Sequence, residues 1–272
     1  MSFIEDLARA AHDVDGVAPF NEATLLALTA GDEPRIHLVD ETSAAIAFGD
    51  APVELVVHPE HRRRGIGREL LERTLVADAT DFWAHGELPG ARALATSAGL
   101  SPARTLLVLR LSLGDEAPVE QVPEGVTLRA FRPDDTDAVV AVNGRAFATH
   151  PEQGAMDRAD FQRRASSDWF DPEGLFVAER DGQVVGFHWT KVEDAPDGER
   201  RGEVYVVGVD PSAHGGGLGS ALTARGLRFM HEQGIRTVDL YVEADNEPAL
   251  RTYGRLGFVE HARDTLFTTP ER

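Results

Sequence analysis

Two residues in the last third of the chain have side chains suited to proton transfer. Glu203 opens an apolar run that predicts a central strand, eight residues before Pro211, and Tyr253 lies four residues before Gly257 in a segment with helical spacing. A carboxylate can take a proton from an ammonium group, and a phenol can give one to a departing anion. Taken singly, Glu203 is equally explained as a charge at a strand end and Tyr253 as a ring packed on a helix. The segment between Glu203 and Tyr253 helps to decide between a role in proton transfer and these structural explanations.

That segment has the pattern of an anion-binding turn. The β-branched run Val204–Val209 breaks at Asp210-Pro211 and continues through glycines 215, 216, 217 and 219 into a helical pattern. A strand, a glycine-rich turn and a helix start bring unpaired backbone N–H groups and the positive end of the helix dipole to one point. No lysine follows the glycines as a Walker loop requires, and the spacing does not fit G-x-G-x-x-G. A glycine-rich turn without a ligand stays open as an alternative.

The stretch resembles the pyrophosphate loop of the GCN5-related N-acetyltransferases, [QR]-x-x-G-x-[GA] after a strand ending V-x-P, with His214 where Gln or Arg is usual. A second copy lies at residues 53–68, where Arg62-x-x-Gly65-x-Gly67 meets the pattern fully. We interpret its three consecutive arginines as a diphosphate contact rather than a merely solvated face. The two loops are 152 residues apart at their prolines. Residues 92–100 also match residues 250–258, at a distance of 158 residues between their terminal glycines. The repeat predicts two homologous domains in tandem.

The predicted fold class is α/β (α+β), with two tandem acetyltransferase-type domains that each have a mixed twisted sheet flanked by helices. We expect an N-terminal domain at residues 1–113, a linker rich in acid, proline and glycine at 114–125, and a C-terminal domain at 126–272. Apolar spacing predicts helices at residues 3–12 and 21–30, the second capped by Asn21, and at 135–147 and 157–166. Strands are expected at residues 175–180 and 184–191, joined by an Asp181-Gly182 hairpin turn.

Composition excludes several classes of function. The formal net charge of −19 disfavours nucleic acid and anionic membranes as partners. The chain has no cysteine, which excludes disulfides and thiolate metal sites, and no apolar run approaches the roughly 18 residues of a membrane span. We expect a cytoplasmic, soluble protein, monomeric and without a metal. Only one of its 27 basic residues is a lysine, Lys191.

The two copies differ at the positions that could transfer protons. The residue eight before Pro59 is Ala51, and the residue four before Gly99 is Ala95. Neither side chain can move a proton. Asn246, eleven residues before Gly257, corresponds to Leu88. We therefore predict one catalytic domain, the second, and a first domain that keeps the phosphate loop without the acid–base pair.

Several segments narrow the resemblance to the tandem acetyltransferases of mycothiol biosynthesis, which transfer acetyl from acetyl-CoA to the cysteinyl amine of cysteinyl-glucosaminyl-inositol. This resemblance covers nearly the whole length of the chain. It is strongest at residues 150–154, 169–175, 188–191, 203–211, 240–246 and 251–253. The resemblance implies that Glu203 is the base and an acceptor contact and that Tyr253 is the acid. It also implies that Glu22, Glu152, Lys191 and Tyr241 bind the acceptor. The alternative for Lys191 is a surface charge at a strand end, but its being the only lysine of the chain favours a function.

The resemblance also implies the coenzyme contacts. In the first domain these would be Leu55, Val56, Val57, Arg63, Arg64, Gly65, Ile66, Gly67 and Arg68. In the second domain they would be Val207, Gly208, Val209, His214, Gly215, Gly216, Gly217, Leu218, Gly219, Ser220, Asn246, Glu247, Pro248, Ala249, Leu250 and Arg251. Two alternatives stay open from sequence: an acetyltransferase with another acceptor, such as an aminoglycoside or a protein N-terminus, and a non-enzymatic acyl-CoA-binding module.

Overall fold

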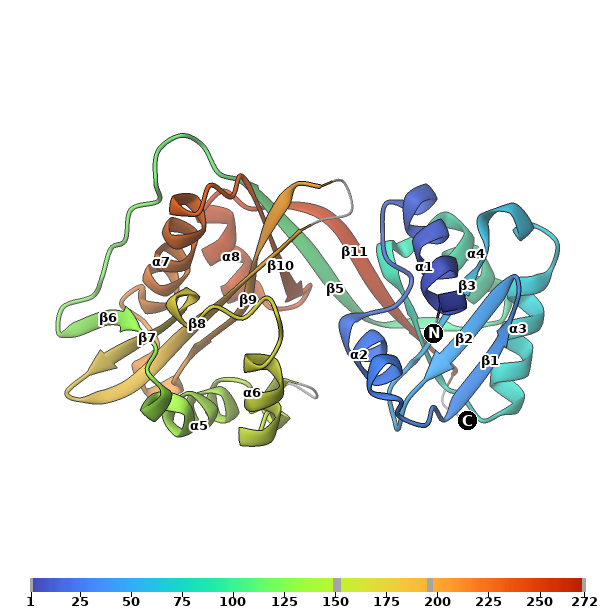
Figure 1. Ribbon diagram of the computed structural model, residues 1–272, viewed down its shortest axis with the longest axis horizontal. Helices are drawn as coiled ribbons and strands as arrows, with labels where there is room; N and C mark the ends of the chain where they lie inside the picture. Colours follow the sequence, from blue (N-terminus) through green and yellow to red (C-terminus); the bar gives the residue numbers. More distant parts are fainter. Residues whose placement is uncertain (1, 149–152, 195–197, 271–272) are drawn as a thin grey trace. The chain divides into compact units, whose positions relative to one another are not determined.

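The computed structural model of the chain describes residues 2–148, 153–194 and 198–270. It separates into two compact units, one made of the residues up to Leu107 together with those from Ala262 onward, the other of Val108–His261 (Figure 1). The strands β5 (Ser101–Ser112) and β11 (Val259–Thr268) each contribute residues to both units. The chain passes from one unit to the other within β5 and again within β11. The domain boundaries predicted from sequence, at residues 113 and 126, stay a prediction.

The first unit is a sheet covered by helices on both faces. Its strands follow the order β1-β2-β3-β4-β11, in which β3 and β4 are parallel and the pairs β1–β2, β2–β3 and β4–β11 are antiparallel. Alternate residues of β2 and β3 face two separate cores, one under α1 and the other under α3 and α4. The further elements are α1 (Ser2–Asp15), α2 (Glu22–Ala30), β1 (Ile36–Asp40), β2 (Ser43–Ala47), β3 (Val53–Val57), α3 (Ile66–Val76), β4 (Asp81–Ala84) and α4 (Pro89–Ser97).

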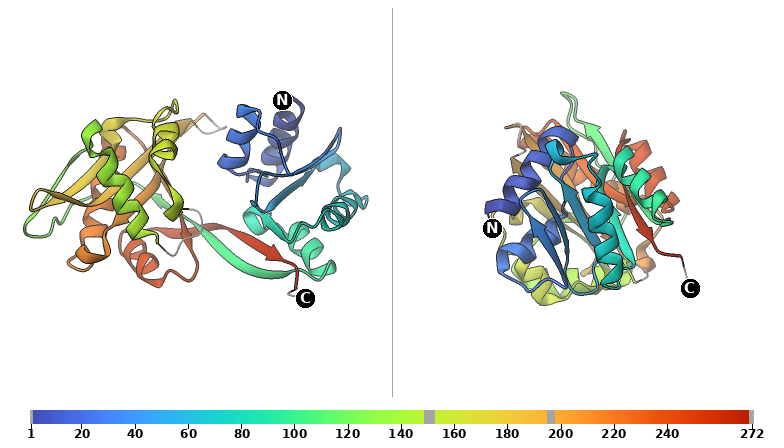
Figure 2. Two further views of the ribbon diagram at one scale, coloured as in Figure 1. Left: turned by 90° about the horizontal axis from the view of Figure 1, so that it is seen from below. Right: turned by 90° about the vertical axis from the view of Figure 1, so that its right-hand side faces the viewer.

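The second unit has the same plan with longer strands. Its order is β5-β10-β9-β8-β7-β6, and β9 pairs in parallel with β10 and antiparallel with β8. The helices α5 and α6 lie on one side of this sheet and α7 and α8 on the other (Figure 1; Figure 2 gives two further views). The elements are β6 (Val126–Ala130), α5 (Thr136–Ala146), α6 (Arg158–Ala165), β7 (Leu175–Arg180), β8 (Gln183–Asp194), β9 (Arg200–Val209), α7 (Leu218–Glu232), β10 (Thr237–Glu243) and α8 (Glu247–Arg255).

The helix α7 packs unusually close to the sheet. A Cβ atom on Gly226 would lie 2.1 Å from Cε1 of His188 on β8, so only glycine fits there. His188 is fully buried, and its Nδ1 donates to the carbonyl of Leu222 at 2.7 Å. Burial lowers the pKa of His188 to about 4, so its imidazole stays neutral at physiological pH. This contact fixes the direction of α7, and with it the loop at the start of the helix.

Candidate active site

The sheet of the second unit forks beside Glu203. β9 and β10 pair only over Arg201–Glu203 and Thr237–Asp239, although both strands continue past this point. Glu203 is therefore the last residue of β9 before the two strands separate. On its other side it lies directly opposite Lys191 of β8. Side chains directly opposite in an antiparallel pair point to the same face of the sheet, so the carboxylate and the ammonium share one face.

A β-bulge on β9 follows Glu203 immediately. Trp189 of β8 pairs with Val206 and Thr190 pairs with Val204, which leaves Tyr205 as the extra residue. Both Val206 and the ring of Tyr205 pack in the core shared with α5 and α6, so the bulge puts two consecutive side chains on that face. The next residues, Val207 and Val209, pack instead with α7. The fork thus has a charged face at Glu203 and an apolar face toward the start of α7.

The predicted phosphate loop has the backbone of an anion site. Gly215, Gly216 and Gly217 all have positive φ, at 87°, 63° and 83°. Gly217 caps α7 without a side chain, and the first backbone bond inside the helix runs from the Ala221 N–H to the Gly217 carbonyl. The N–H groups of the three residues before Ala221 therefore open the helix, where anions are favoured.

His214, the departure from the usual Gln or Arg, makes the same contact as its counterpart in the first copy. Its Nε2 donates to the Val209 carbonyl at 3.1 Å, and Arg62 donates from Nε to the Val57 carbonyl at 3.0 Å. Both contacts join the loop to the last residue of the preceding strand. The histidine therefore preserves the anchoring of the loop while removing one permanent positive charge from it.

Tyr253 lies on α8 of the same unit as Glu203. Its ring is half-buried and packs edge-to-face on Phe258 with 5.8 Å between centroids. Burial raises the pKa of the Tyr253 phenol to about 12. The hydroxyl is therefore protonated at neutral pH and can serve as a proton donor.

The other predicted site residues are more scattered. Tyr241 is exposed on β10, two residues past the fork, and Glu22 is the first residue of α2 in the first unit. Asn246 caps α8 by accepting a hydrogen bond from the Ala249 N–H at 3.2 Å, and the predicted contacts at residues 247–251 form the first turns of that helix. Glu152 lies outside the described residues.

The phosphate loop of the first unit repeats the backbone of the second with different side chains. Gly65 caps α3 with φ 89°, as Gly217 caps α7, but Arg63 takes the left-handed conformation, φ 63°, where the second copy has Gly215. Arg62 is engaged in a bidentate ion pair with Asp15, at 2.6 and 2.7 Å. Arg63, Arg64 and Arg68 are exposed on this loop and the first turn of α3.

The first sheet also forks at a carboxylate, which sequence analysis missed. β3 and β4 pair only over Val53–Phe82 and Glu54–Trp83, so Glu54 holds the position in the first fork that Glu203 holds in the second. Its side chain is 1% exposed. Oε1 accepts from the Asn21 N–H at 2.9 Å and lies 2.5 Å from Nε2 of His85, whose Nδ1 lies 3.1 Å from Asp264 on β11. The first fork is thus filled by a carboxylate–imidazole–carboxylate cluster of its own.

This cluster predicts that the free energy of unfolding decreases at alkaline pH. Burial alone would disfavour the charged imidazole, but the hydrogen bonds and charges of Asp264 and Glu54 raise the pKa of His85 to about 9. Because folded His85 binds its proton more tightly than the unfolded chain does, protonation stabilises the fold. This stabilisation is complete below the pKa of histidine in the unfolded chain, about 6.5, and it is lost as pH rises through 9. We expect the free energy of unfolding, from urea denaturation, to fall by about 3 kcal/mol between pH 6 and pH 10. In His85→Gln this fall should disappear; an equal fall in the variant would contradict the assignment.

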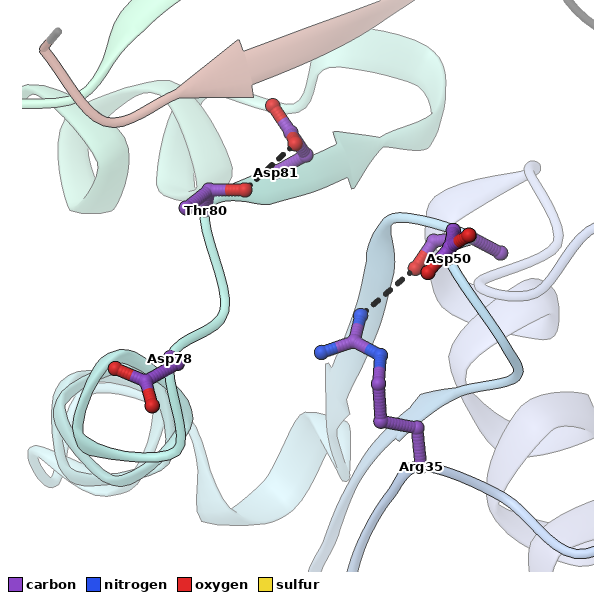
Figure 3. A pocket seen from close by; sticks show the side chains of 6 residues that line it. Arg35, Asp50, Asp78, Thr80 and Asp81 are labelled. Carbon is purple, nitrogen blue, oxygen red and sulfur yellow. Dashed lines mark hydrogen bonds between the residues drawn. The ribbon is translucent and has the colours of Figure 1, made fainter.

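Two of the cavities among the described residues lie in the first unit. The larger, about 330 Å³, is lined by Arg35, Asp50, Ala51, Asp78, Thr80 and Asp81 (Figure 3). Its three carboxylates outnumber its one cation, Arg35, whose guanidinium donates to the carbonyls of Gly49 and Ala51, so the cavity has a negative net charge and is unsuited to a diphosphate. The smaller, about 220 Å³, lies between α3 and α4 and includes Arg68, one of the predicted coenzyme contacts.

Comparisons with known proteins bear on the fold and the family. A family profile described as the acetyltransferase (GNAT) family matches residues 145–258. A solved GCN5-related N-acetyltransferase from Sphaerobacter thermophilus is similar in fold, with a TM-score of 0.67 and 23% identity over 97% of this chain and 90% of the other. A tandem GNAT protein from the clavulanic acid biosynthesis pathway gives a TM-score of 0.61 and 22% identity over 85% of this chain and 80% of that one. The fold is that of the GCN5-related acetyltransferases.

A curated relative narrows this class. The mycothiol acetyltransferase of Thermomonospora curvata is 49% identical over 97% of this chain and 92% of its own length. The chain therefore belongs to the mycothiol acetyltransferase family, and the predicted fold class and enzyme class are confirmed. None of its described helices is long and apolar enough to cross a membrane.

Proposed function

We propose that this chain transfers acetyl from acetyl-CoA to the cysteinyl amine of cysteinyl-glucosaminyl-inositol, which yields mycothiol and CoA. The observation that carries the proposal is the pairing of Glu203 with Lys191 at the fork of the second sheet. A carboxylate suits an ammonium group, and a neighbouring cation suits the oxygens of a polyhydroxylated acceptor. The name of the relative from Thermomonospora curvata supports the same acceptor.

The coenzyme would bind along the α7 side of the fork. Its diphosphate would lie against the N–H groups of residues 215–220, where three glycines with positive φ leave the backbone open. The strand residues Val207 and Val209 face that side, and their backbone N–H groups are candidates for holding the thioester carbonyl. Polar donors aimed at a developing oxyanion stabilise the tetrahedral intermediate.

Chemistry would then proceed across the fork. Glu203 takes a proton from the acceptor ammonium, and the free amine attacks the thioester carbonyl to form a tetrahedral intermediate. The carbon–sulfur bond breaks as the amide carbonyl forms, and Tyr253 gives its proton to the departing thiolate. The amide nitrogen loses its remaining extra proton to solvent, and the Tyr253 phenolate takes up a proton from solvent. The high pKa of Tyr253 keeps the phenol protonated throughout the working pH range. Glu22, Glu152, Lys191 and Tyr241 would bind the rest of the acceptor.

We propose a different role for the first unit. Its loop repeats the capping glycine and carries exposed arginines, which supports coenzyme binding at residues 55–57 and 63–68. At the position of Glu203 it has Glu54, buried against His85 and without access for an acceptor amine. The domain pattern we propose is one catalytic and one non-catalytic acetyltransferase domain, in a monomeric cytoplasmic protein that needs no metal.

A thiol-release assay with acetyl-CoA tests the acceptor. We expect CoA release with cysteinyl-glucosaminyl-inositol, and release at least about 100-fold slower with the des-cysteinyl glucosaminyl-inositol, with an aminoglycoside and with a peptide N-terminus, because each lacks part of the predicted contacts. Preferred turnover of an aminoglycoside or a peptide would replace the proposed acceptor while leaving the acetyltransferase class intact.

A further inference from the structure

The ammonium of Lys191 is held against two aromatic rings. Nζ lies 5.2 Å from the ring centroid of Trp169 and 5.7 Å from that of Tyr205, both within the range of cation–π attraction. The Lys191 side chain is only 8% exposed. A charge removed from water to this extent needs compensation from its surroundings.

Lys191 is also paired with a carboxylate. Nζ lies 2.9 Å from Oε2 of Glu193, but the Glu193 side chain is 52% exposed. Solvent screens ion pairs of this kind and leaves them little net energy. The two rings, by contrast, are half-buried and packed into the core under α5 and α6. The rings therefore give the ammonium a more rigid and less solvated contact than Glu193 does.

Each ring is fixed in turn. The Tyr205 hydroxyl accepts a hydrogen bond from Nη1 of Arg164 at 2.9 Å, and the Arg164 guanidinium also lies over the Tyr205 ring at 5.6 Å. Trp169 packs edge-to-face on Tyr205 at 4.8 Å and lies 6.0 Å from Trp189, which is fully buried. Tyr205 is itself the bulge residue of β9, so the irregularity beside Glu203 is what places its ring toward Lys191.

We propose that Trp169 and Tyr205 are positioning residues that hold the Lys191 ammonium on the face of the sheet that Glu203 occupies, where it donates to an oxygen of the acceptor. Lysine has a flexible four-carbon stem, so two rings against its ammonium restrict the positions that the charge can take. The inference rests on the proposed function, since it assigns these residues to the binding of a polyhydroxylated amine. Their contribution is to acceptor binding, separate from proton transfer by Glu203.

Trp169→Leu tests this arrangement, because it keeps an apolar side chain and removes the ring. We expect the KM for cysteinyl-glucosaminyl-inositol to rise about 3- to 30-fold, toward the value of Lys191→Ala, with the KM for acetyl-CoA changed less than about twofold. Tyr205→Phe keeps the ring and should have a smaller effect. The matched control is Trp83→Leu in the first unit, where Arg104 lies 5.6 Å over the indole; it should leave both KM values unchanged.

A second readout uses the single lysine of the chain. In protein labelled with ¹⁵N-lysine, a held and shielded ammonium gives one slowly exchanging NMR signal, and we expect this signal to broaden or disappear in Trp169→Leu but not in Trp83→Leu. An unchanged signal overturns the proposal, and so does an unchanged acceptor KM when the wild type turns the acceptor over. A wild type that does not turn over this acceptor contradicts the proposed function instead, and the lysine signal then still decides whether the rings hold the ammonium.

Discussion

Replacing Glu203 by Gln is expected to lower kcat by about 10²–10⁴-fold, the usual cost of removing a general base. The amide keeps the shape of the carboxylate at the fork and can still hydrogen-bond, but it cannot take a proton from the acceptor ammonium. Its neighbour Lys191 and the pairing with Asp239 should be preserved, so the sheet is expected to stay folded. Steady-state kinetics with saturating acetyl-CoA give the measurement.

The pH dependence separates loss of a base from a general disturbance. As pH rises, more of the acceptor amine is free without help, so the rate of Glu203→Gln should approach that of the wild type. A deficit that stays constant with pH would mean that Glu203 acts by binding or by structure. Asp239→Asn, on the neighbouring strand, is a matched control: its carboxylate pairs with Arg110 at 2.7 Å, so we expect it to affect stability more than the pH profile.

Gly217→Glu is expected to remove coenzyme binding at the second unit. The glycine takes φ 83° at the first turn of α7, a conformation that other L-residues adopt only with strain. A glutamate there would also bring a negative charge to the site proposed for the diphosphate. The glutamate carboxylate and the diphosphate would repel each other strongly where water is partly excluded. We expect turnover to fall below about 1% of the wild type, and the calorimetric affinity for acetyl-CoA at this site to fall by at least about 100-fold.

The chain carries its own controls for this substitution. Gly217→Gln imposes the same backbone strain without the charge, so the difference between the two variants measures the electrostatic part. Gly65→Glu makes the same change at the equivalent position of the first unit, φ 89°. It should leave turnover near that of the wild type and lower only the number of coenzyme molecules bound. If Gly65→Glu abolished turnover and Gly217→Glu did not, the two loops would have to exchange roles.

Local signals predicted much of the fold. Asn21 caps α2 as expected, and the Asp181-Gly182 turn joins β7 to β8 with positive φ at both residues. The expected strand at residues 175–180 is β7 itself, and the expected helix at 157–166 is α6 with Asp157 as its cap. These features are set by residues within a few positions of each other, through capping bonds, turn conformation and alternation. The glycine-rich turn before α7 was predictable for the same reason, and its binding of a phosphate stays a prediction.

The sites at the forks needed the pairing of distant strands. Counting back from the loop prolines aligns Ala51 with Glu203, yet the fork of the first sheet lies at Glu54, three positions later. β9 has more residues between its fork and its loop, including the bulge at Tyr205, and no local pattern marks a bulge in advance. His85 and Asp264 are 179 residues apart, so their meeting at Glu54 depends on β11 pairing with β4. The signals available were a histidine directly after a short strand and an aspartate inside a late strand.

The division of labour between the two units is tested most directly by a single-turnover measurement with enzyme in excess over acetyl-CoA. We predict that Arg63→Ala combined with Arg64→Ala, which removes the exposed cations of the first loop, leaves the rate constant of acetyl transfer within about twofold of the wild type. Glu203→Gln in the same experiment should lower it by about 10²–10⁴-fold. A fall of that size in the double arginine variant, with Glu203→Gln near the wild type, would place the chemistry in the first unit and contradict the account.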